Sequence, residues 1–196
     1  LTKIVIAVLV LLSLAPISIG YSYWNNLIAN ESNNLVIGEW WGTPIYTAQE
    51  FYDFAMKSDS SSNDVYYLAN DIDFSGFSWG VDSSQEYITF RGTLDGNGKT
   101  ISNLTIYPTS SYTSYIGIFP QMEGGSVYNL VLSNVETDVY SFYSSIVPGL
   151  ITGRVIGSTN TISDITIVDS GVRGTSSTGT GGLVGAVENY STVLNI

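Results

Sequence analysis

The spacing of apolar and polar residues changes along the chain and divides the sequence into three parts. Residues 1–28 contain an almost unbroken apolar run from Ile4 to Ile19, which predicts a hydrophobic helix roughly 24 Å long. Residues 29–44 predict a linker and a first strand. Residues 45–196 alternate apolar and polar positions in short segments separated by turn residues, a pattern typical of strands with one buried face. The sequence therefore predicts a mainly β head preceded by one long N-terminal α-helix.

A short helix is predicted at the start of the head. Thr47 and Glu50 have the spacing of a capping box, in which each side chain accepts from the other residue's backbone N–H. Phe51 and Phe54 share one helical face, so we expect an amphipathic helix over Ala48–Lys57. Exposed strand edges invite further pairing, and we expect this helix to cap the first end of the β-structure.

One motif occurs four times in the head. It consists of Gly-x-apolar, a turn of variable length, and then apolar-x-Asn/Asp-apolar. The first halves are Gly92–Leu94, Gly117–Phe119, Gly149–Ile151 and Gly182–Val184, and the second halves are Ile101–Ile106, Val127–Leu132, Ile162–Ile167 and Val193–Ile196. A unit this small cannot bury an apolar face alone, so neighbouring units must stack. The repeat predicts a small parallel β-helix.

Aligning the four motifs predicts which residues lie side by side. One apolar ladder is expected to contain Leu94, Phe119, Ile151 and Val184, and a second is expected to contain Leu104, Leu130, Ile165 and Ile196. Turns are expected to stack on turns at Asn103, Asn129, Asp164 and Asn195. The sequence Asp95–Gly98 predicts a tight turn, because Asn and Gly accept positive φ. The segments Ser133–Ser145 and Val168–Thr180 are expected to project as loops.

The head resembles a known repeat family. Gly182-Leu183-Val184-Gly185 spells the glycine-leucine-valine-glycine signature of GLUG-type repeat proteins. The sequence from Tyr66 to Gly76, followed by Phe90–Ile106, is also similar to the way those segments begin. The resemblance covers roughly Ile45 to Ile196. It implies a right-handed parallel β-helix on surface or secreted proteins of bacteria and archaea, with adhesive or structural roles.

Three interpretations of the N-terminal helix are open. It is a secretory signal peptide cleaved near Ala15 or Gly20, a retained membrane anchor, or a pilin-type helix that lies in the membrane before assembly and in a filament core afterwards. The first 28 residues resemble the mature N-termini of archaeal type IV pilin-like proteins, and Gly20–Trp40 has a fainter likeness to secreted matrix-fibre proteins with β-sandwich folds. We favour the pilin-type helix. Its assembly residues are then Ile4, Ala7, Val8, Leu11, Leu12, Ala15, Pro16 and Ile19.

Charge and composition narrow the function. Seventeen acidic and six basic residues give a net charge of −11, and the basic residues are scattered singly. This argues against a nucleic-acid surface and against docking of the head on anionic lipid. The chain has no cysteine and no histidine, so it lacks disulfides, the commonest general base and the commonest transition-metal ligand. A neutral-polar, aromatic-rich composition is commoner in extracellular proteins.

Candidate chemistry is sparse. Asp71 and Asp73 share one strand face and offer oxygen ligands for calcium, but we favour a role in turns. A set of aromatic residues either stacks on sugars or fills packing contacts: Trp40, Trp41, Tyr66, Tyr67, Phe77, Trp79, Tyr112, Tyr115, Tyr140, Phe142 and Tyr143. Asn30, Asn103 and Asn189 stand in glycosylation sequons. We predict no catalytic residue, no metal and no cofactor.

These observations predict a non-enzymatic structural protein, extracellular or on the cell surface. It would polymerise with itself into a filament through the N-terminal helix, which lies in the membrane before assembly. Surface glycans are a further candidate partner. A membrane-anchored or secreted β-helix adhesin or carbohydrate-binding module is the alternative, followed by a lyase-like enzyme.

Overall fold

The computed structural model describes residues 27–29, 35–37, 42–57, 64–85, 87–110, 115–139, 146–157, 160–174 and 181–188. The chain divides between Trp41 and Gly42 into two units. In the first unit, β1 (Leu27–Ala29) and β2 (Leu35–Ile37) form an antiparallel pair. The strand β1 thus includes the last two residues of the range 1–28 predicted to be helical. The rest of that helix lies outside the described residues.

The second unit begins with a capped helix, as the sequence predicts. The helix α2 (Ala48–Ala55) starts where expected and ends two residues before Lys57, with Met56 as its C-cap. The capping box is formed: the Glu50 N–H donates to Thr47 Oγ1 at 3.2 Å, and Glu50 Oε2 accepts from the Thr47 N–H at 3.1 Å. These bonds satisfy backbone donors that the first helical turn leaves without a partner.

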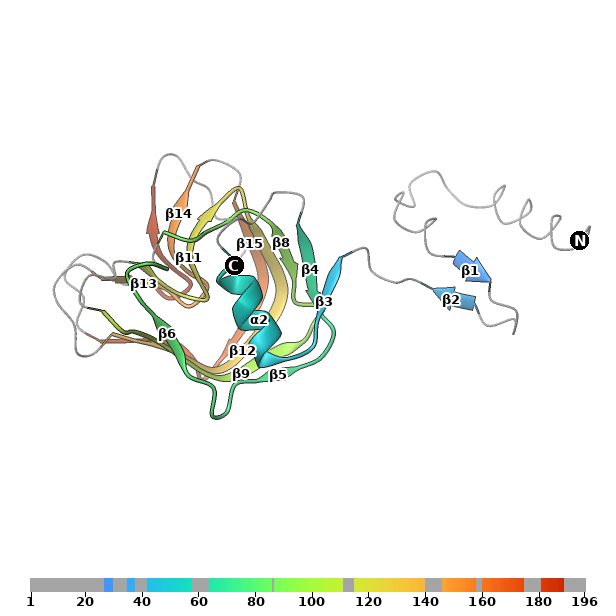
Figure 1. Cartoon of the computed structure of the whole chain (residues 1–196), viewed down its shortest axis with the longest axis horizontal. Coiled ribbons are helices and arrows are strands. Elements are labelled where there is room, and N and C mark those ends of the chain that lie inside the picture. Colours follow the sequence, from blue (N-terminus) through green and yellow to red (C-terminus); the bar gives the residue numbers. More distant parts are fainter. Residues whose placement is uncertain are drawn as a thin grey trace, which may run out of the picture. The chain divides into compact units, whose positions relative to one another are not determined.

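The remaining strands wind as a parallel β-solenoid of about three turns (Figure 1). Before the first full turn come β3 (Thr43–Ile45), β4 (Val65–Leu68), β5 (Ile72–Asp73) and β6 (Trp79–Val81). The first turn contains β7 (Thr89–Phe90), β8 (Thr93–Asp95) and β9 (Thr100–Pro108), and the second contains β10 (Tyr115–Ile116), β11 (Phe119–Glu123) and β12 (Ser126–Asp138). The third contains β13 (Val147–Pro148), β14 (Thr152–Ile156), β15 (Thr161–Val168) and β16 (Gly171–Arg173), and β17 (Val184–Val187) follows it. The parallel β-helix prediction is confirmed at this level, while its right-handedness stays a prediction.

The strands of successive turns form the walls of the solenoid. One wall is a four-stranded sheet in the order β17-β14-β11-β7, and β10 pairs with β13 in a smaller sheet. The other strands form a nine-stranded sheet around β12. The strand β12 is long because it passes first beside β8 and then beside β9. The turn Asp95–Gly98 therefore joins two strands of one coil and does not close an antiparallel hairpin.

The predicted second ladder is correct in one of its contacts. Leu130 lies beside Ile165 in adjacent turns, as expected. Leu104 instead lies beside Val135, five residues further along β12. The alignment placed Leu104 incorrectly because an apolar-x-Asn-apolar sequence occurs twice in β12, and its second occurrence is the partner of β9. Ile196 lies outside the described residues.

The predicted first ladder is wrong at Leu94. This residue lies between Tyr66 and Val127 in the nine-stranded sheet. The four-stranded sheet instead aligns Phe119, Thr152 and Val184, so Ile151 is offset by one residue. The physical reason is that Gly-x-apolar occurs at two kinds of corner. Gly92 precedes a strand of the large sheet, whereas Gly117 and Gly149 precede strands of the four-stranded sheet.

Both segments that were expected to be loops are partly strands. The strand β12 continues through Asp138, which corrects the loop predicted for Ser133–Ser145. The strand β16 occupies Gly171–Arg173 within the predicted loop Val168–Thr180. Both strands belong to the nine-stranded sheet and pair with neighbouring turns.

The interior is apolar, and α2 covers it at one end. Phe51 is buried and contacts the rings of Phe54, Phe74 and Trp79 at centroid distances of 5.8, 5.9 and 6.0 Å. Figure 1 shows α2 within the ring of strands. Burial of this helical face confirms that the helix caps the solenoid near its first turns, because the exposed alternative would leave several aromatic rings in water.

Candidate functional site

Six Asn and Asp residues mark two corners of the solenoid. All have positive φ between 47° and 57°: Asn97, Asn103, Asn129, Asn134, Asp164 and Asp169. Asn and Asp tolerate this left-handed conformation better than most residues do. The strand registers place Asn129 beside Asp164 at one corner, and Asn134 between Asn103 and Asp169 at the other. The corners therefore repeat in each turn, and their residues form two columns along the solenoid.

The second column is joined by side-chain hydrogen bonds. Asn134 Nδ2 donates to Asn103 Oδ1 at 2.8 Å, and Asn103 Nδ2 donates to Asp73 Oδ1 at 2.8 Å. Asp73 Oδ1 also accepts from the Ser75 N–H and hydroxyl at 2.9 and 2.7 Å. The amide of Asn103, followed by Ser75, lowers the pKa of Asp73, because these bonds favour the charged carboxylate. We refer to Asp73, Asn103 and Asn134 as the amide ladder.

The first column is anchored on a buried carboxylate. Asp95 is 5% exposed, and its Oδ1 accepts from the Asn97 N–H at 2.7 Å and from Asn129 Nδ2 at 3.3 Å. Asn97 Nδ2 donates to the Leu68 carbonyl of the preceding turn at 3.1 Å. Tyr128 lies beside Asp95 in the neighbouring strand. Burial, and secondly the Asp95 charge, raise the pKa of Tyr128.

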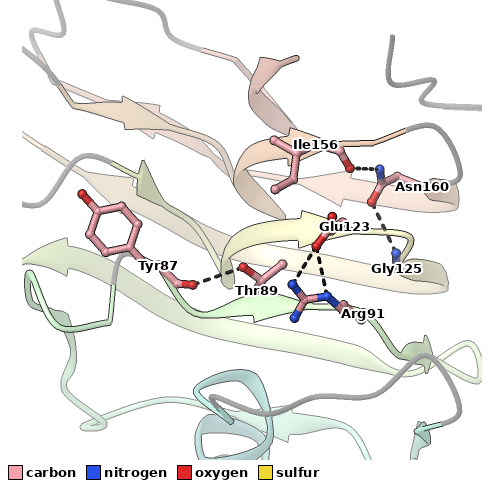
Figure 2. Close-up of polar contacts among 7 residues, drawn as sticks. All are labelled: Tyr87, Thr89, Arg91, Glu123, Gly125, Ile156 and Asn160. Carbon is pink, nitrogen blue, oxygen red and sulfur yellow. Dashed lines mark hydrogen bonds and ion pairs between the residues drawn. The ribbon is translucent and has the colours of Figure 1, made fainter. Parts of the chain in front are cut away.

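A third polar cluster lies where the four-stranded sheet turns into the large one (Figure 2). Arg91 follows β7, and its Nε and Nη2 donate to Glu123 Oε2 in β11 at 3.0 and 2.6 Å. Both side chains are more than 40% exposed, so the pair contributes less than about 1 kcal/mol. Thr89 Oγ1 donates to the Tyr87 carbonyl at 3.1 Å. The Arg91–Glu123 pair joins successive turns on the outside of the solenoid, whereas the Thr89 bond stays within one segment of the chain.

Asn160 is the buried member of this cluster. It is 2% exposed, and its Oδ1 accepts from the Gly125 N–H of the preceding turn at 3.3 Å. Its Nδ2 donates to the Ile156 carbonyl at 2.8 Å, as Figure 2 shows. Asn160 therefore satisfies backbone groups at a corner where no strand pairing reaches them, a requirement for buried polar groups.

Each of the three clusters contains side-chain hydrogen bonds that join one turn of the solenoid to the next. In the described ranges, no three His, Cys, Asp or Glu residues lie close enough to hold a metal ion. Asp71 Oδ1 accepts from the Thr100 N–H at 2.8 Å, and Asp73 is the end of the amide ladder. The two carboxylates are thus used as the turn residues that the sequence favoured.

The last described turn is more exposed than the turns before it. Ile167, Val168 and Val187 are 42%, 43% and 53% exposed, whereas Leu132, beside Ile167 in β12, is fully buried. An open groove of about 470 Å³ lies at this turn. It is lined by residues of β12, β15 and β16 that include Glu136, Ile167, Asp169 and Arg173.

Most predicted site residues lie outside the described ranges. These are the eight assembly residues Ile4, Ala7, Val8, Leu11, Leu12, Ala15, Pro16 and Ile19, and the sequon residues Asn30 and Asn189. In the parts of the chain that the structure describes, no helix is long and apolar enough to cross a membrane. Asn103 is described and exposed, but its Nδ2, the atom that a glycan would modify, donates within the amide ladder.

Among the described residues, the aromatic side chains proposed to stack on sugars do not form one surface. Trp79 is fully buried against Phe51, and Tyr66 packs on Phe54 at a centroid distance of 4.3 Å. Tyr115 lies below the Arg154 guanidinium at 5.0 Å. Six members lie outside the described residues: Trp40, Trp41, Tyr112, Tyr140, Phe142 and Tyr143. The core therefore takes up several of the described rings.

Three corner residues were not predicted from the sequence: Asn134, Asp169 and Asn160. A periodicity would have revealed the first two. Asn129 and Asn134 are five residues apart, as are Asp164 and Asp169, so each turn carries a pair of left-handed corners. Asn160 has no counterpart at the equivalent corner of the preceding turn, where Gly124 and Gly125 stand, and no repeat could have indicated it.

Comparison with known proteins gives one partial match. The chain is 39% identical over 85 residues to halomucin from Haloquadratum walsbyi, and the match covers 41% of this chain. The chain spans about 1% of the length of that relative. No protein-family profile matches the chain, and no solved structure matches it. The GLUG resemblance thus stays a hypothesis, whereas the halomucin similarity and the β-solenoid are consistent with a surface-exposed structural or adhesin-like protein.

Proposed function

We propose that the chain is a non-enzymatic structural protein of the cell surface, whose solenoid serves as a stiff spacer. The observation that carries this proposal is the use of the polar side chains. The amide ladder, Asp95 and Asn160 all bind neighbouring turns, so the groups that an enzyme would direct at a substrate are used to hold the coils together. The similarity to halomucin supports a surface location.

Self-assembly into a filament is the more specific form of this proposal. It rests on the apolar run Ile4–Ile19, because an uncharged helix of this length must be hidden from water. The N-terminus of the protein isolated from cells tests it. A start at the beginning of the printed sequence supports a retained helix, and a start near Tyr21 refutes assembly through that helix.

Surface location is tested on intact cells. A membrane-impermeant amine reagent should label Lys99 or Lys57 in the folded head, while a cytoplasmic marker protein stays unlabelled. Labelling only after lysis would refute the proposal. Two further assays address the alternatives: specific binding on a glycan array would establish the adhesin, and turnover of a uronate polymer would establish the lyase-like enzyme.

A further inference from the structure

One glycosylation sequon of the chain lies within a described strand. Asn103, Leu104 and Thr105 are consecutive residues of β9 and have the Asn-x-Thr spacing to which sugars are attached. Leu104 is fully buried, whereas Asn103 and Thr105 are both exposed. The middle residue of the motif is therefore fixed in the interior, and the acceptor amide and the hydroxyl of the motif are both accessible from solvent.

The corner around Asn103 leaves room for a bulky group. Its column consists of short polar side chains: Asp73 with Ser75 in the preceding turn, and Asn134 and then Asp169 in the following turns. All of these side chains are exposed. In the part of the chain that the structure describes, this column holds no aromatic or long side chain, so a sugar on Asn103 would extend into solvent.

The amide ladder uses one of the two hydrogens on Asn103 Nδ2. Nδ2 donates to Asp73 Oδ1 in the preceding turn, and Asn103 Oδ1 accepts from Asn134 Nδ2 in the following turn, each at 2.8 Å. The two bonds leave the planar amide in opposite directions along the solenoid. They therefore use the hydrogen anti to the carbonyl oxygen, because that N–H points away from the C=O. The syn hydrogen has no acceptor among the described residues.

A glycan would take the place of this syn hydrogen. Attachment converts the side chain of Asn103 into a secondary amide, and secondary amides keep their N–H anti to the C=O, as the trans peptide bond does. The anti N–H therefore stays on Nδ2 and can still donate to Asp73. The carbonyl oxygen is unchanged by the reaction and can still accept from Asn134.

We propose that Asn103 carries an N-linked glycan on the outside of the solenoid and that the amide ladder stays intact beneath it. The co-substrate is a sugar activated as an ester of a lipid phosphate. Nδ2 forms a bond to the anomeric carbon of the sugar, and the bond from that carbon to the phosphate oxygen breaks. The phosphate leaves with the bonding electron pair, and Nδ2 releases its syn proton.

The inference rests on the surface location proposed above, because N-linked sugars are attached to secreted proteins. It goes beyond that proposal by naming a modified atom and the class of its co-substrate. A glycan is bulky and solubilising, so this corner of the solenoid would be covered by sugar and the amides below it would be shielded.

Mass spectrometry of the protein purified from its own cells tests the inference. Cleavage after Lys99 and Arg154 gives the fragment of residues 100–154, which contains a single sequon, that of Asn103. We expect the fragment to exceed its sequence mass by one or more sugar units, and its fragmentation to place them on Asn103. Thr105→Ser keeps the hydroxyl of the motif and should keep the added mass. Thr105→Val has a similar shape without the hydroxyl and should lose it.

Both variants leave the ladder residues unchanged, so thermal unfolding at several pH values tests the second part of the inference. Glycosylated wild type and Thr105→Val should lose the same part of their stability as the pH falls through the lowered pKa of Asp73. Loss of this acid dependence in the glycosylated protein alone would show that the glycan breaks the ladder and would overturn that part.

A wild-type fragment at its sequence mass, or an added mass that survives in Thr105→Val, would overturn the glycosylation of Asn103. The labelling of intact cells separates this failure from that of the proposed function. A labelled head with an unmodified fragment would refute this inference alone, whereas labelling only after lysis would refute the surface location.

Discussion

Replacing Leu132 and its neighbour Val131 with alanine tests the register of the solenoid. The two residues are adjacent in β12 but point to opposite faces. Leu132 lies between Ile101 and Ile167 and is fully buried, whereas Val131 lies between Thr100 and Thr166 and is partly exposed. The pair therefore separates burial in the interior from the effect of a substitution in the same strand.

The expected magnitudes follow from the carbon atoms removed. Leu132→Ala deletes three buried carbons, a transfer loss of about 2.4 kcal/mol at about 0.8 kcal/mol each. The remaining cavity raises the expected loss of unfolding free energy to about 3–4 kcal/mol. Val131→Ala removes two half-exposed carbons and some β-propensity, and should cost about 1 kcal/mol.

Urea unfolding of the two variants and of the wild-type chain measures both values. Far-ultraviolet circular dichroism reports the β-structure, and the fluorescence of buried Trp79 reports the core. A Leu132→Ala loss at least about 2 kcal/mol larger than that of Val131→Ala is expected. Equal losses, or a larger loss for Val131→Ala, would refute the register, because a slip of one residue exchanges the two faces of the strand.

Four further substitutions, one of them a control, test the corners and the outer surface. Asp73→Asn should lower the stability of the fold above about pH 4. The folded protein binds the Asp73 proton less tightly than the unfolded chain does, so the charged carboxylate stabilises the fold. The difference in stability from wild type should therefore vanish as the pH falls through the lowered pKa of Asp73. Thermal unfolding at several pH values measures it, and a difference that persists in acid would contradict it. Gly149→Ala should lower the free energy of unfolding by at least about 2 kcal/mol, because its added Cβ would lie 2.2 Å from the Thr152 carbonyl oxygen. Gly182→Ala is the control and should be tolerated, because there is open space around Gly182. Equal melting temperatures for the two variants would contradict this prediction. Glu123→Gln should lower the free energy of unfolding by less than about 1 kcal/mol, because the ion pair of Glu123 with Arg91 is exposed. A larger loss, or a loss that salt does not change, would show that the pair is more buried than described.

Local patterns predicted the elements of this fold better than they predicted the register between turns. The capping box at Thr47 and the helix after it depend on residues a few positions apart, and both are confirmed. The parallel coil was also predicted correctly. Register depends on which corner a residue occupies, and the motifs around Gly92 and Gly117 look alike although they stand at different corners. The length of β12 was missed for the same reason, since its Asn corners were taken as the ends of strands.

The candidate site was predictable only in part. Asn129 and Asp164 were expected to stack and do lie at one left-handed corner, whereas Asn103, expected in the same column, lies at the other corner beside Asn134. Their partners could not be deduced, because hydrogen bonds such as Asn134 to Asn103 join residues 31 positions apart. The role of Asn160 could not be predicted either, because it depends on the shape of one corner. There its side-chain amide bonds to backbone groups that no strand pairing reaches.

The direction of the amide ladder bears on how such a protein can change in length. Asn134 donates to Asn103, and Asn103 donates to Asp73, so Asn103, the amide inside the ladder, both gives and receives a bond. A carboxylate receives bonds and gives none, which suits Asp73 to the first position and to no interior one. A duplicated coil inserted between Asp73 and Asn134 would bring its own donor and its own acceptor and leave the ladder balanced. Gene duplication could therefore lengthen this solenoid one turn at a time without changing either end.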